Sequence, residues 1–304
     1  MRKKQSKTLM KIYDEDLYRL SMRIGKDRSA STLASLSQGR RYASLFLENV
    51  YNKEDIPLEK ITPRMINDFS AYLSSERQLS GGTVWLACQQ LKGVVSRAHQ
   101  RGDVSWNPFA GFRIAKNIRP REYLSEDELI TLVTHEFKKE TLSYARDIFV
   151  FAAMTGLSFI DIRELTASDI VHIGDATWII SKRHKTKVPF QVRLFDIPLT
   201  IIRKYQTNGQ KKIFGELEYR VLAYKIKEVM KEIGIPRHVT MHCARHSFAV
   251  LAINKGMPIE SLSRILGHTK ISTTQIYARI TLQKLDKDMT ELEKQLYLIN
   301  NCKK

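Results

Sequence analysis

The chain has few cysteines and no long apolar run. Its 304 residues include Cys88, Cys243 and Cys302, which lie too far apart for a disulfide framework or a paired-cysteine metal motif. So few cysteines fit a reducing environment, and we expect a cytoplasmic protein. No stretch approaches about eighteen consecutive apolar residues, and the basic N-terminus precedes no apolar segment. We therefore expect neither a membrane span nor a signal peptide.

Acidic residues are also scarce relative to basic ones. Fifty Lys and Arg residues stand against thirty-two Asp and Glu residues, which gives a formal net charge of +18. Such an excess favours a polyanionic partner, because basic side chains that neutralise phosphates release condensed counterions. The alternative is a basic protein without a nucleic-acid partner. The hydrophobic content of 43% is enough to bury the cores of two domains.

The first part of the chain is predicted to be helical. Residues 1–30 form a lead-in segment, and residues 31–109 form a compact domain whose apolar side chains recur at helical spacing. One of its helices begins at Thr62 and Pro63, which suit the N-cap and the first turn. A break at 80–83 precedes a helix over 84–100. Three basic residues near its end face either DNA or solvent: Arg97, His99 and Arg101.

The rest of the chain reads as a second domain after a basic linker. Residues 110–121 contain four Arg or Lys residues and suit a strap across a phosphate backbone. Residues 122–281 mix helices with two predicted strands, 177–182 and 188–195, joined by a basic hairpin tip. Residues 282–304 form a C-terminal helix. The predicted fold class is mainly α with a small antiparallel β-sheet, an α+β domain beside a separate N-terminal helical domain.

Residues 240–280 gather the side chains that point to phosphate chemistry. His242 and Arg245 are three residues apart, so on a helix they share one face. His268 follows a glycine that can end a helix, and Tyr277 lies nine residues further on. Arginine can hold two phosphate oxygens at once, and a tyrosine hydroxyl becomes a nucleophile when nearby cations stabilise its anion.

A metal site is the alternative for this stretch. It contains His242, Cys243, His246 and His268, but Cys243 should point away from His242. No cysteine pair or second HxxxH motif completes a tetrahedral ligand set. We therefore expect no metal.

The combined pattern resembles the tyrosine recombinase (phage integrase) family. HCARHSFA at 242–249 looks like its HxxR box, ILGH at 265–268 like its second histidine box, and Tyr277 like its nucleophile. Lys185, in HKTK, matches the family's β-hairpin lysine. The resemblance covers residues 31–106, as the family's SAM-like core-binding domain, and about 120–296, as its catalytic domain.

The first arginine box of the family departs from the pattern in this chain. It normally reads TGLR, whereas here Ser158 follows Thr155-Gly156-Leu157. Loss of a charged transition-state donor costs about 3–4 kcal/mol unless another residue replaces it. Arg146 is our candidate second clamp, with pairing to Asp147 as its structural alternative. Arg163 is the weaker candidate. If Arg146 is the clamp, Arg146→Ala abolishes cleavage and leaves DNA binding largely intact.

The resemblance implies a mechanism and partners. Tyr277 attacks a phosphate of double-stranded DNA and forms a 3′-phosphotyrosyl link. Arg245, His268 and the replacement arginine stabilise the phosphorane, Lys185 is the general acid, and His242 assists proton transfer. No cofactor, metal or ATP is needed.

The resemblance also implies a homo-oligomer, a tetramer on paired sites, with accessory DNA-bending proteins as further candidate partners. After Tyr277, apolar residues at spacings of three and four form one face of the C-terminal helix: Leu282, Leu285, Met289, Leu292, Leu296 and Ile299. This face docks either on its own domain or in trans on a neighbouring subunit.

Three functions fit the sequence. The leading one is a site-specific recombinase for integration, excision or inversion of a DNA element. A type IB topoisomerase shares the tyrosine chemistry but rejoins the same strand. A DNA-binding protein that is catalytically impaired through the loss of the first-box arginine is the third.

Overall fold

The computed structural model describes residues 7–113, 122–207, 209–277 and 282–301. In the last of these ranges it describes only the backbone of residues 282–284, 287, 295 and 297–301. The chain divides into two compact units, residues 1–120 and 121–304. Each unit has its own hydrophobic core. Within the described ranges, no helix is both long and apolar enough to cross a membrane. Of the predicted basic linker, residues 110–121, the part from 114 to 121 lies outside the described residues.

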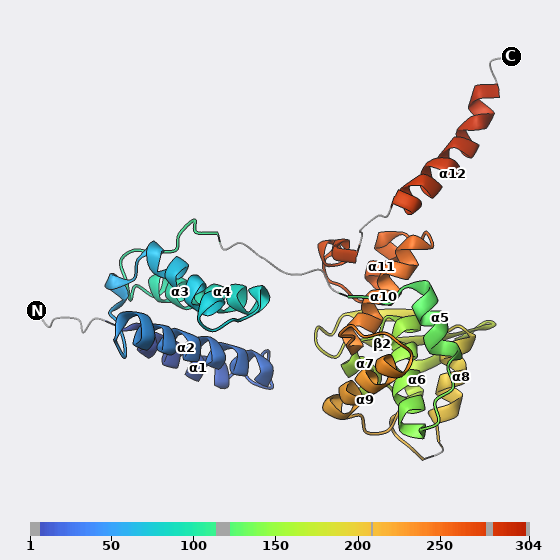
Figure 1. The fold of residues 1–304 in the computed structure, drawn as a ribbon, viewed down its shortest axis with the longest axis horizontal. Helices are drawn as coiled ribbons and strands as arrows, with labels where there is room; N and C mark the ends of the chain where they lie inside the picture. The colour runs from blue at the N-terminus through green and yellow to red at the C-terminus, as the bar shows by residue number, and fades with distance from the viewer. Residues whose placement is uncertain (1–6, 114–121, 208, 278–281, 302–304) are drawn as a thin grey trace, which may run out of the picture. The chain divides into compact units, whose positions relative to one another are not determined.

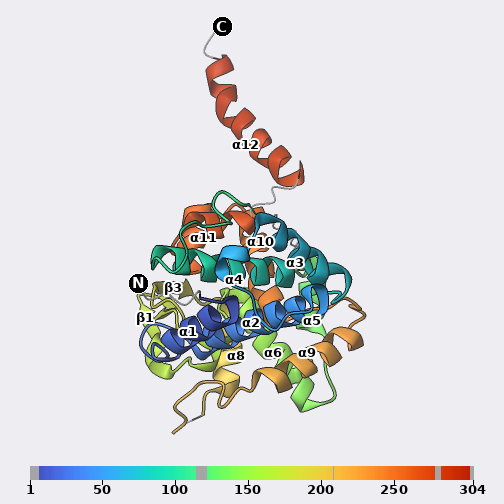
Figure 2. The ribbon, with the colours of Figure 1, turned by 90° about the vertical axis from the view of Figure 1, so that its left-hand side faces the viewer.

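Unit 1 is a helical bundle, as predicted. Figures 1 and 2 show α1 and α2 side by side, with α3 and α4 packed against them. The helix that begins at Pro63, after the N-cap Thr62, is confirmed. The break predicted at 80–83 is instead the start of a helix, because the Ser80 hydroxyl caps it by accepting from the Thr83 N–H. The elements are α1 (Leu9–Ser21), α2 (Ala30–Tyr51), η1 (Leu58–Lys60), α3 (Pro63–Ser75) and α4 (Gly81–Gln100).

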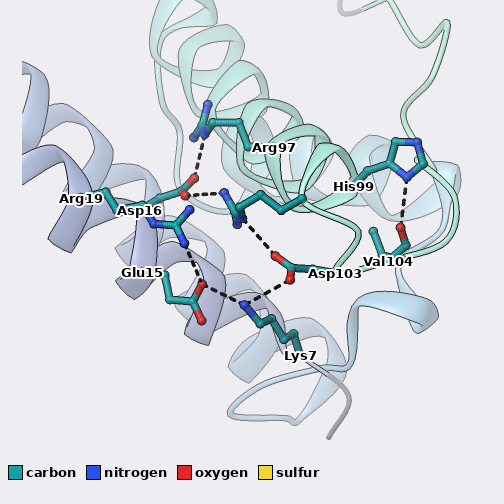
Figure 3. A network of polar contacts seen from close by, with 9 residues as sticks. Lys7, Glu15, Asp16, Arg19, Arg97, His99, Asp103 and Val104 are labelled. Carbon is teal, nitrogen blue, oxygen red and sulfur yellow. Dashed lines mark hydrogen bonds and ion pairs between the residues drawn. The ribbon is translucent and has the colours of Figure 1, made fainter. Parts of the chain in front are cut away.

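A network of ion pairs joins α1 to the C-terminal end of α4 (Figure 3). The buried carboxylate of Asp16, on α1, accepts from Arg97 at 2.8 Å and from Arg101 at 3.1 Å. His99 Nδ1 contacts the carbonyl of Val104 at 3.1 Å. The three basic residues near the end of α4 therefore have partners inside the protein, and α1 packs into the core of unit 1.

Unit 2 is built around α6, which packs against α5, α8, α9 and α10 (Figure 1). Ser125 and Glu128 have the spacing that predicts a capping box, and the structure confirms one at the start of α5. The helices are α5 (Glu126–Thr134), α6 (Glu140–Thr155), α7 (Phe159–Arg163), α8 (Asp196–Tyr205), α9 (Tyr219–Glu232), α10 (Met241–Asn254), α11 (Ile259–Ile265) and α12 (Leu282–Asn301), with 3-10 turns η2 (Ala167–Asp169), η3 (Ile271–Thr273) and η4 (Gln275–Tyr277).

The sheet of unit 2 is antiparallel and has three strands, in the order β1-β2-β3: β1 (Ile170–Ile173), β2 (Ala176–Lys182) and β3 (Pro189–Arg193). The sequence predicted β2 and β3 and missed β1. That strand has only four residues, which is too short for alternation to be a clear signal. Ile179 of β2 and Val192 of β3 are register partners and are both buried, so this face of the sheet belongs to the core.

Candidate active site

Arg245 lies at the centre of the site and is only 7% exposed. It is on α10, which begins after Thr240, whose N–H donates to the Cys243 sulfur. Its guanidinium donates to the carbonyl of Gly156 and to that of Leu266, both at 2.7 Å. Burial and the nearby charge of Arg183 lower the pKa of Arg245 to about 10. Arg245 therefore remains a cation at neutral pH.

His268 is held between Arg245 and Thr274. Arg245 Nη2 lies 3.0 Å from His268 Nε2, and His268 Nδ1 lies 2.8 Å from the Thr274 hydroxyl oxygen. A guanidinium only donates, so Nε2 is the acceptor and Nδ1 carries the proton. Burial, followed by the charges of Arg245 and Arg183, lowers the pKa of His268 to about 4. The imidazole is therefore neutral at pH 7.

Tyr277 packs between two imidazole rings. Its ring stacks on that of His268, with centroids 6.2 Å apart and planes at 10°, and its centroid is 4.7 Å from that of His246. Tyr277 is 3% exposed and has a hydrogen bond with Arg245. Tyr277 is the last residue of the 3-10 turn η4.

The other two residues predicted for proton transfer lie at the protein surface. His242 is exposed on α10, one turn before Arg245, and its charge contributes to lowering the pKa of His268. Lys185 is exposed in the turn between β2 and β3. Within the described parts of the chain, no hydrogen bond or ion pair joins Lys185 to another residue.

The arginines considered as replacements for the first-box arginine lie in different surroundings. Arg146 donates to Asp147 at 2.5 Å and to the carbonyl of His135 at 2.9 Å. Its Nη1 also donates to the two carbonyls of Leu132 and Val133, so it caps the end of α5. These contacts are the structural alternative that we set against a clamp role. Arg163 is paired with Glu164 at 2.9 Å.

Three residues of the cluster were not predicted as site residues: Arg183, His246 and Thr274. Arg183 was assigned to the hairpin tip, yet it is 5% exposed. Candidate metal ligands have other contacts, since the Cys243 sulfur contacts Thr240, His268 contacts Arg245, and the His246 ring packs against Tyr277. The part of the chain that the structure describes holds no group of three or more His, Cys, Asp or Glu residues suited to a metal ion.

Comparison with known proteins identifies the class. Residues 122–284 match the phage integrase family, and residues 8–117 match the phage integrase SAM-like domain. The first of these matches spans more than half of the chain. The protein therefore belongs to the phage integrase family, the tyrosine recombinases, and is an enzyme that breaks and rejoins DNA.

Individual relatives agree with this assignment. Tyrosine recombinase XerC of Xylella fastidiosa (strain M23) is 26% identical over 232 residues, which are 71% of this chain and 77% of that protein. Tyrosine recombinase XerA of Saccharolobus solfataricus is 39% identical over 88 residues, 28% of this chain and 29% of that protein.

Solved structures show the same fold. The Tn1549 transposon integrase in complex with circular intermediate DNA superposes with a TM-score of 0.74 at 16% identity, covering 93% of this chain and 99% of that one. A lambda integrase tetramer bound to a Holliday junction superposes with a TM-score of 0.71 at 21% identity, covering 91% and 80%.

Proposed function

We propose that the protein is a site-specific recombinase that cleaves one DNA strand with Tyr277 as the nucleophile and forms a 3′-phosphotyrosyl intermediate. One observation carries this proposal: Tyr277 is hydrogen-bonded to the buried cation Arg245 and stacked on His268, which Arg245 also contacts. A cation bonded to a phenol stabilises the phenolate, and the same cation can bind the nonbridging oxygens of a phosphate.

The proposed step balances bonds and protons. The Tyr277 oxygen forms a bond to phosphorus, and the bond from phosphorus to the 5′ oxygen breaks. Lys185 gives its proton to the departing 5′ oxygen, and His242 accepts the proton that the Tyr277 phenol loses. Arg245 donates to the oxygens on which charge develops, and His268 supports it by accepting a hydrogen bond from the Arg245 guanidinium. The 5′-hydroxyl of a second strand then attacks the phosphotyrosine, so no cofactor supplies energy.

Because Tyr277 is buried, the proposed mechanism requires a change of conformation around it. Tyr277 is 3% exposed, whereas attack needs contact between the phenol oxygen and a phosphorus atom. The segment that carries Tyr277 must therefore shift when DNA binds. Single 3-10 turns suit such a shift, because each is held by few backbone hydrogen bonds, such as the one from the Tyr277 N–H to the Thr274 carbonyl.

We also propose that the enzyme acts as a tetramer on paired double-stranded sites. The side chains of α12 that line its predicted apolar face are 43–57% exposed at the described positions Leu285, Met289, Leu292 and Leu296. An exposed apolar face on a helix beyond the active site suits docking on a neighbouring subunit. Integration, excision and inversion share this chemistry, and a cytoplasmic location follows from the proposed DNA substrate.

A covalent-adduct experiment tests the function. The protein is incubated with sheared genomic DNA of its host and denatured, and DNA attached to protein is captured and sequenced. We expect adducts at discrete positions with free 5′-hydroxyl ends, which define the target duplex. Tyr277→Phe should form none, whereas Tyr224→Phe, which alters an exposed tyrosine of α9, should behave as wild type. Adducts that persist in Tyr277→Phe would reject the proposed nucleophile.

A second assay separates the alternatives. Two differently labelled target duplexes are mixed with the protein. A recombinase yields products that join the two labels, whereas a topoisomerase of type IB only relaxes or rejoins each duplex. A catalytically impaired DNA-binding protein retards the duplexes and forms no adduct.

A further inference from the structure

We propose that Arg183 is the second phosphate clamp of this enzyme and supplies the positive charge that Ser158 cannot. This inference rests on the proposed role of Tyr277. Arg183 takes the place of Arg146 as the candidate clamp. Arg146 caps α5, whereas Arg183 was expected only as part of the hairpin tip.

The sheet turns Arg183 toward the protein interior. Strand residues alternate between faces, and Ile179 of β2 is buried, so the position of Arg183 continues the buried face just past the end of the strand. The Arg183 backbone closes the hairpin through hydrogen bonds with Val188 and Lys187, both at 2.8 Å. Its guanidinium lies 4.2 Å from the ring centroid of Phe190 on β3. Its side chain is therefore held in place by both strands.

Arg183 reaches the place toward which the side chain at position 158 points. The Ser158 hydroxyl donates to Asp161 Oδ2 at 2.6 Å, and Arg183 Nη1 donates to the same oxygen at 2.7 Å. Because the Ser158 oxygen and Arg183 Nη1 both hydrogen-bond to this carboxylate oxygen, the distance between them cannot exceed the sum of those two distances. The missing charge at position 158 is thus present nearby, delivered from another part of the chain.

Arg183 and Arg245 also bind neighbouring peptides. Arg183 Nη2 donates to the carbonyl of Ile265 at 3.0 Å, and Arg245 Nη2 donates to the carbonyl of Leu266 at 2.7 Å. These carbonyls are at the end of α11, where the helix dipole favours cations. The fit is tight at Gly267, where an added Cβ would lie 2.8 Å from Arg183 Cγ and Nε.

The charge of Arg183 and its unpaired Nε–H indicate that the site binds an anion. The Arg183 charge lowers the pKa values of both Arg245 and His268, and a Tyr277 anion would raise the pKa of Arg183. Two buried cations close enough to influence each other are costly without a negative partner beyond Asp161. Arg183 Nε is buried without a hydrogen-bond partner among the described residues, so this N–H is available to a ligand.

A purely structural ion pair between Arg183 and Asp161 is the competing explanation. Asp161 accepts from Arg183, from the Ser158 hydroxyl and from the His184 N–H, so the pair also organises the start of the hairpin. Loss of Arg183 would then harm folding, or slow cleavage whatever the charge on the phosphate. Only a clamp makes the effect depend on that charge.

The test compares two substrates. One is the target duplex, and the other carries a methylphosphonate at the scissile position, where a methyl group replaces one charged oxygen. We expect Arg183→Ala to slow adduct formation on phosphate about 100-fold or more. On methylphosphonate the difference from wild type should shrink by at least about tenfold, because little negative charge remains to be stabilised.

Further variants keep the test decisive if Arg183→Ala folds poorly. Arg183→Gln keeps a polar N–H donor without the charge, and should show the same substrate dependence. Arg183→Lys should be intermediate on phosphate. Arg193→Ala removes an exposed cation from β3 and should leave both rates unchanged. Thermal melting and duplex retardation monitor folding and binding.

The outcomes separate the two proposals. Equal slowing on both substrates by folded Arg183→Ala or Arg183→Gln, or normal cleavage of phosphate, would overturn the role of Arg183. Absence of a Tyr277 adduct with the wild-type protein would overturn the proposed function instead. Recovery of phosphate cleavage in the double variant Ser158→Arg/Arg183→Ala would further support a shared location for the charge.

Discussion

Arg245 donates a hydrogen bond to Nε2 of His268 over 3.0 Å, and this contact requires a neutral imidazole. The arrangement couples the protonation of His268 to the integrity of the site. Protonation would place a second N–H against the guanidinium and a positive charge beside Arg245. The lowered pKa of His268, about 4, agrees with that geometry.

We expect folding stability to fall with acid through His268. The folded pKa is about 4, whereas an unfolded histidine titrates near 6.5. The unfolded chain therefore binds the proton first, and the contribution of His268 is complete above about pH 6.5 and is lost as pH falls to about 4. Urea titrations at pH 7.0, 5.5 and 4.5 measure this.

The comparison needs a histidine control, since carboxylates also titrate in this range. In His268→Asn, the fall in the free energy of unfolding between pH 7.0 and 4.5 should be smaller than in wild type. His238→Gln, which alters an exposed histidine, should retain the wild-type slope. An unchanged slope in His268→Asn would contradict a neutral, buried imidazole.

Gly267→Ala should slow cleavage by displacing Arg183. Gly267 has a φ of +59°, so alanine there costs about 1–2 kcal/mol of stability, and its Cβ would also lie 2.8 Å from Arg183. Because misplacement of about 1 Å can cost on the order of 100-fold in rate, we expect adduct formation to slow by about 10- to 100-fold.

Gly234→Ala is the matched control for Gly267→Ala. Gly234 has a φ of +78° and no atom within 4 Å of a built Cβ, so it carries the backbone strain alone. Both variants should lose similar stability in a urea titration, and only Gly267→Ala should lose cleavage. Equal cleavage by the two folded proteins would argue against a functional role for the packing of Arg183 on Gly267.

Arg146→Ala should reduce stability and spare the chemistry. Arg146 donates to carbonyls at the end of α5 and to Asp147, which keeps Lys204 and Tyr205 as partners. Loss of these hydrogen bonds should destabilise unit 2 by about 1–3 kcal/mol. Adduct formation, measured where circular dichroism shows the variant folded, should match wild type. Abolished cleavage by the folded variant would restore Arg146 as the clamp.

Charges on the exposed face of α12 should impair assembly. Met289 and Leu292 are 57% and 45% exposed, so Met289→Glu/Leu292→Glu should leave monomer stability within about 0.5 kcal/mol. Tetramers on paired target duplexes, counted by mass photometry, should need at least about tenfold more protein, because each buried apolar side chain contributes about 1.5–3 kcal/mol. Thr290→Glu places a charge away from this face, and assembly should be normal. Normal tetramers with the double variant would reject the docking role.

Much of the framework could be predicted from the sequence because it depends on local signals. Pro63 after Thr62 and the Ser125–Glu128 capping box define helix starts within a few residues, and the structure confirms both. The motif around Arg245 predicted the family for a similar reason, because all of its residues lie within one short segment of the chain.

The features of the site that the sequence did not predict depend on tertiary packing. Arg183 appears in the sequence as one of several basic residues near a turn, and only its distant contacts with Asp161 and the Ile265 carbonyl distinguish it from exposed Lys185. Alternation from Ile179 was the available signal, because it predicts an inward side chain at position 183. The clamp role of Arg146 stays a prediction, and its contacts favour the structural alternative, since an arginine in an apolar helix can be satisfied entirely by carbonyls and a neighbouring acid.

The shared oxygen of Asp161 bears on how activity is inferred for other members of this family. Ser158 and Arg183 meet there from separate elements, so a charge lost at one alignment column can be regained at another without leaving its location in space. A survey that scores the first box alone would class such chains as degenerate. Counting inward-facing arginines just past the second strand, together with an acid three residues after the serine, would recover them as enzymes.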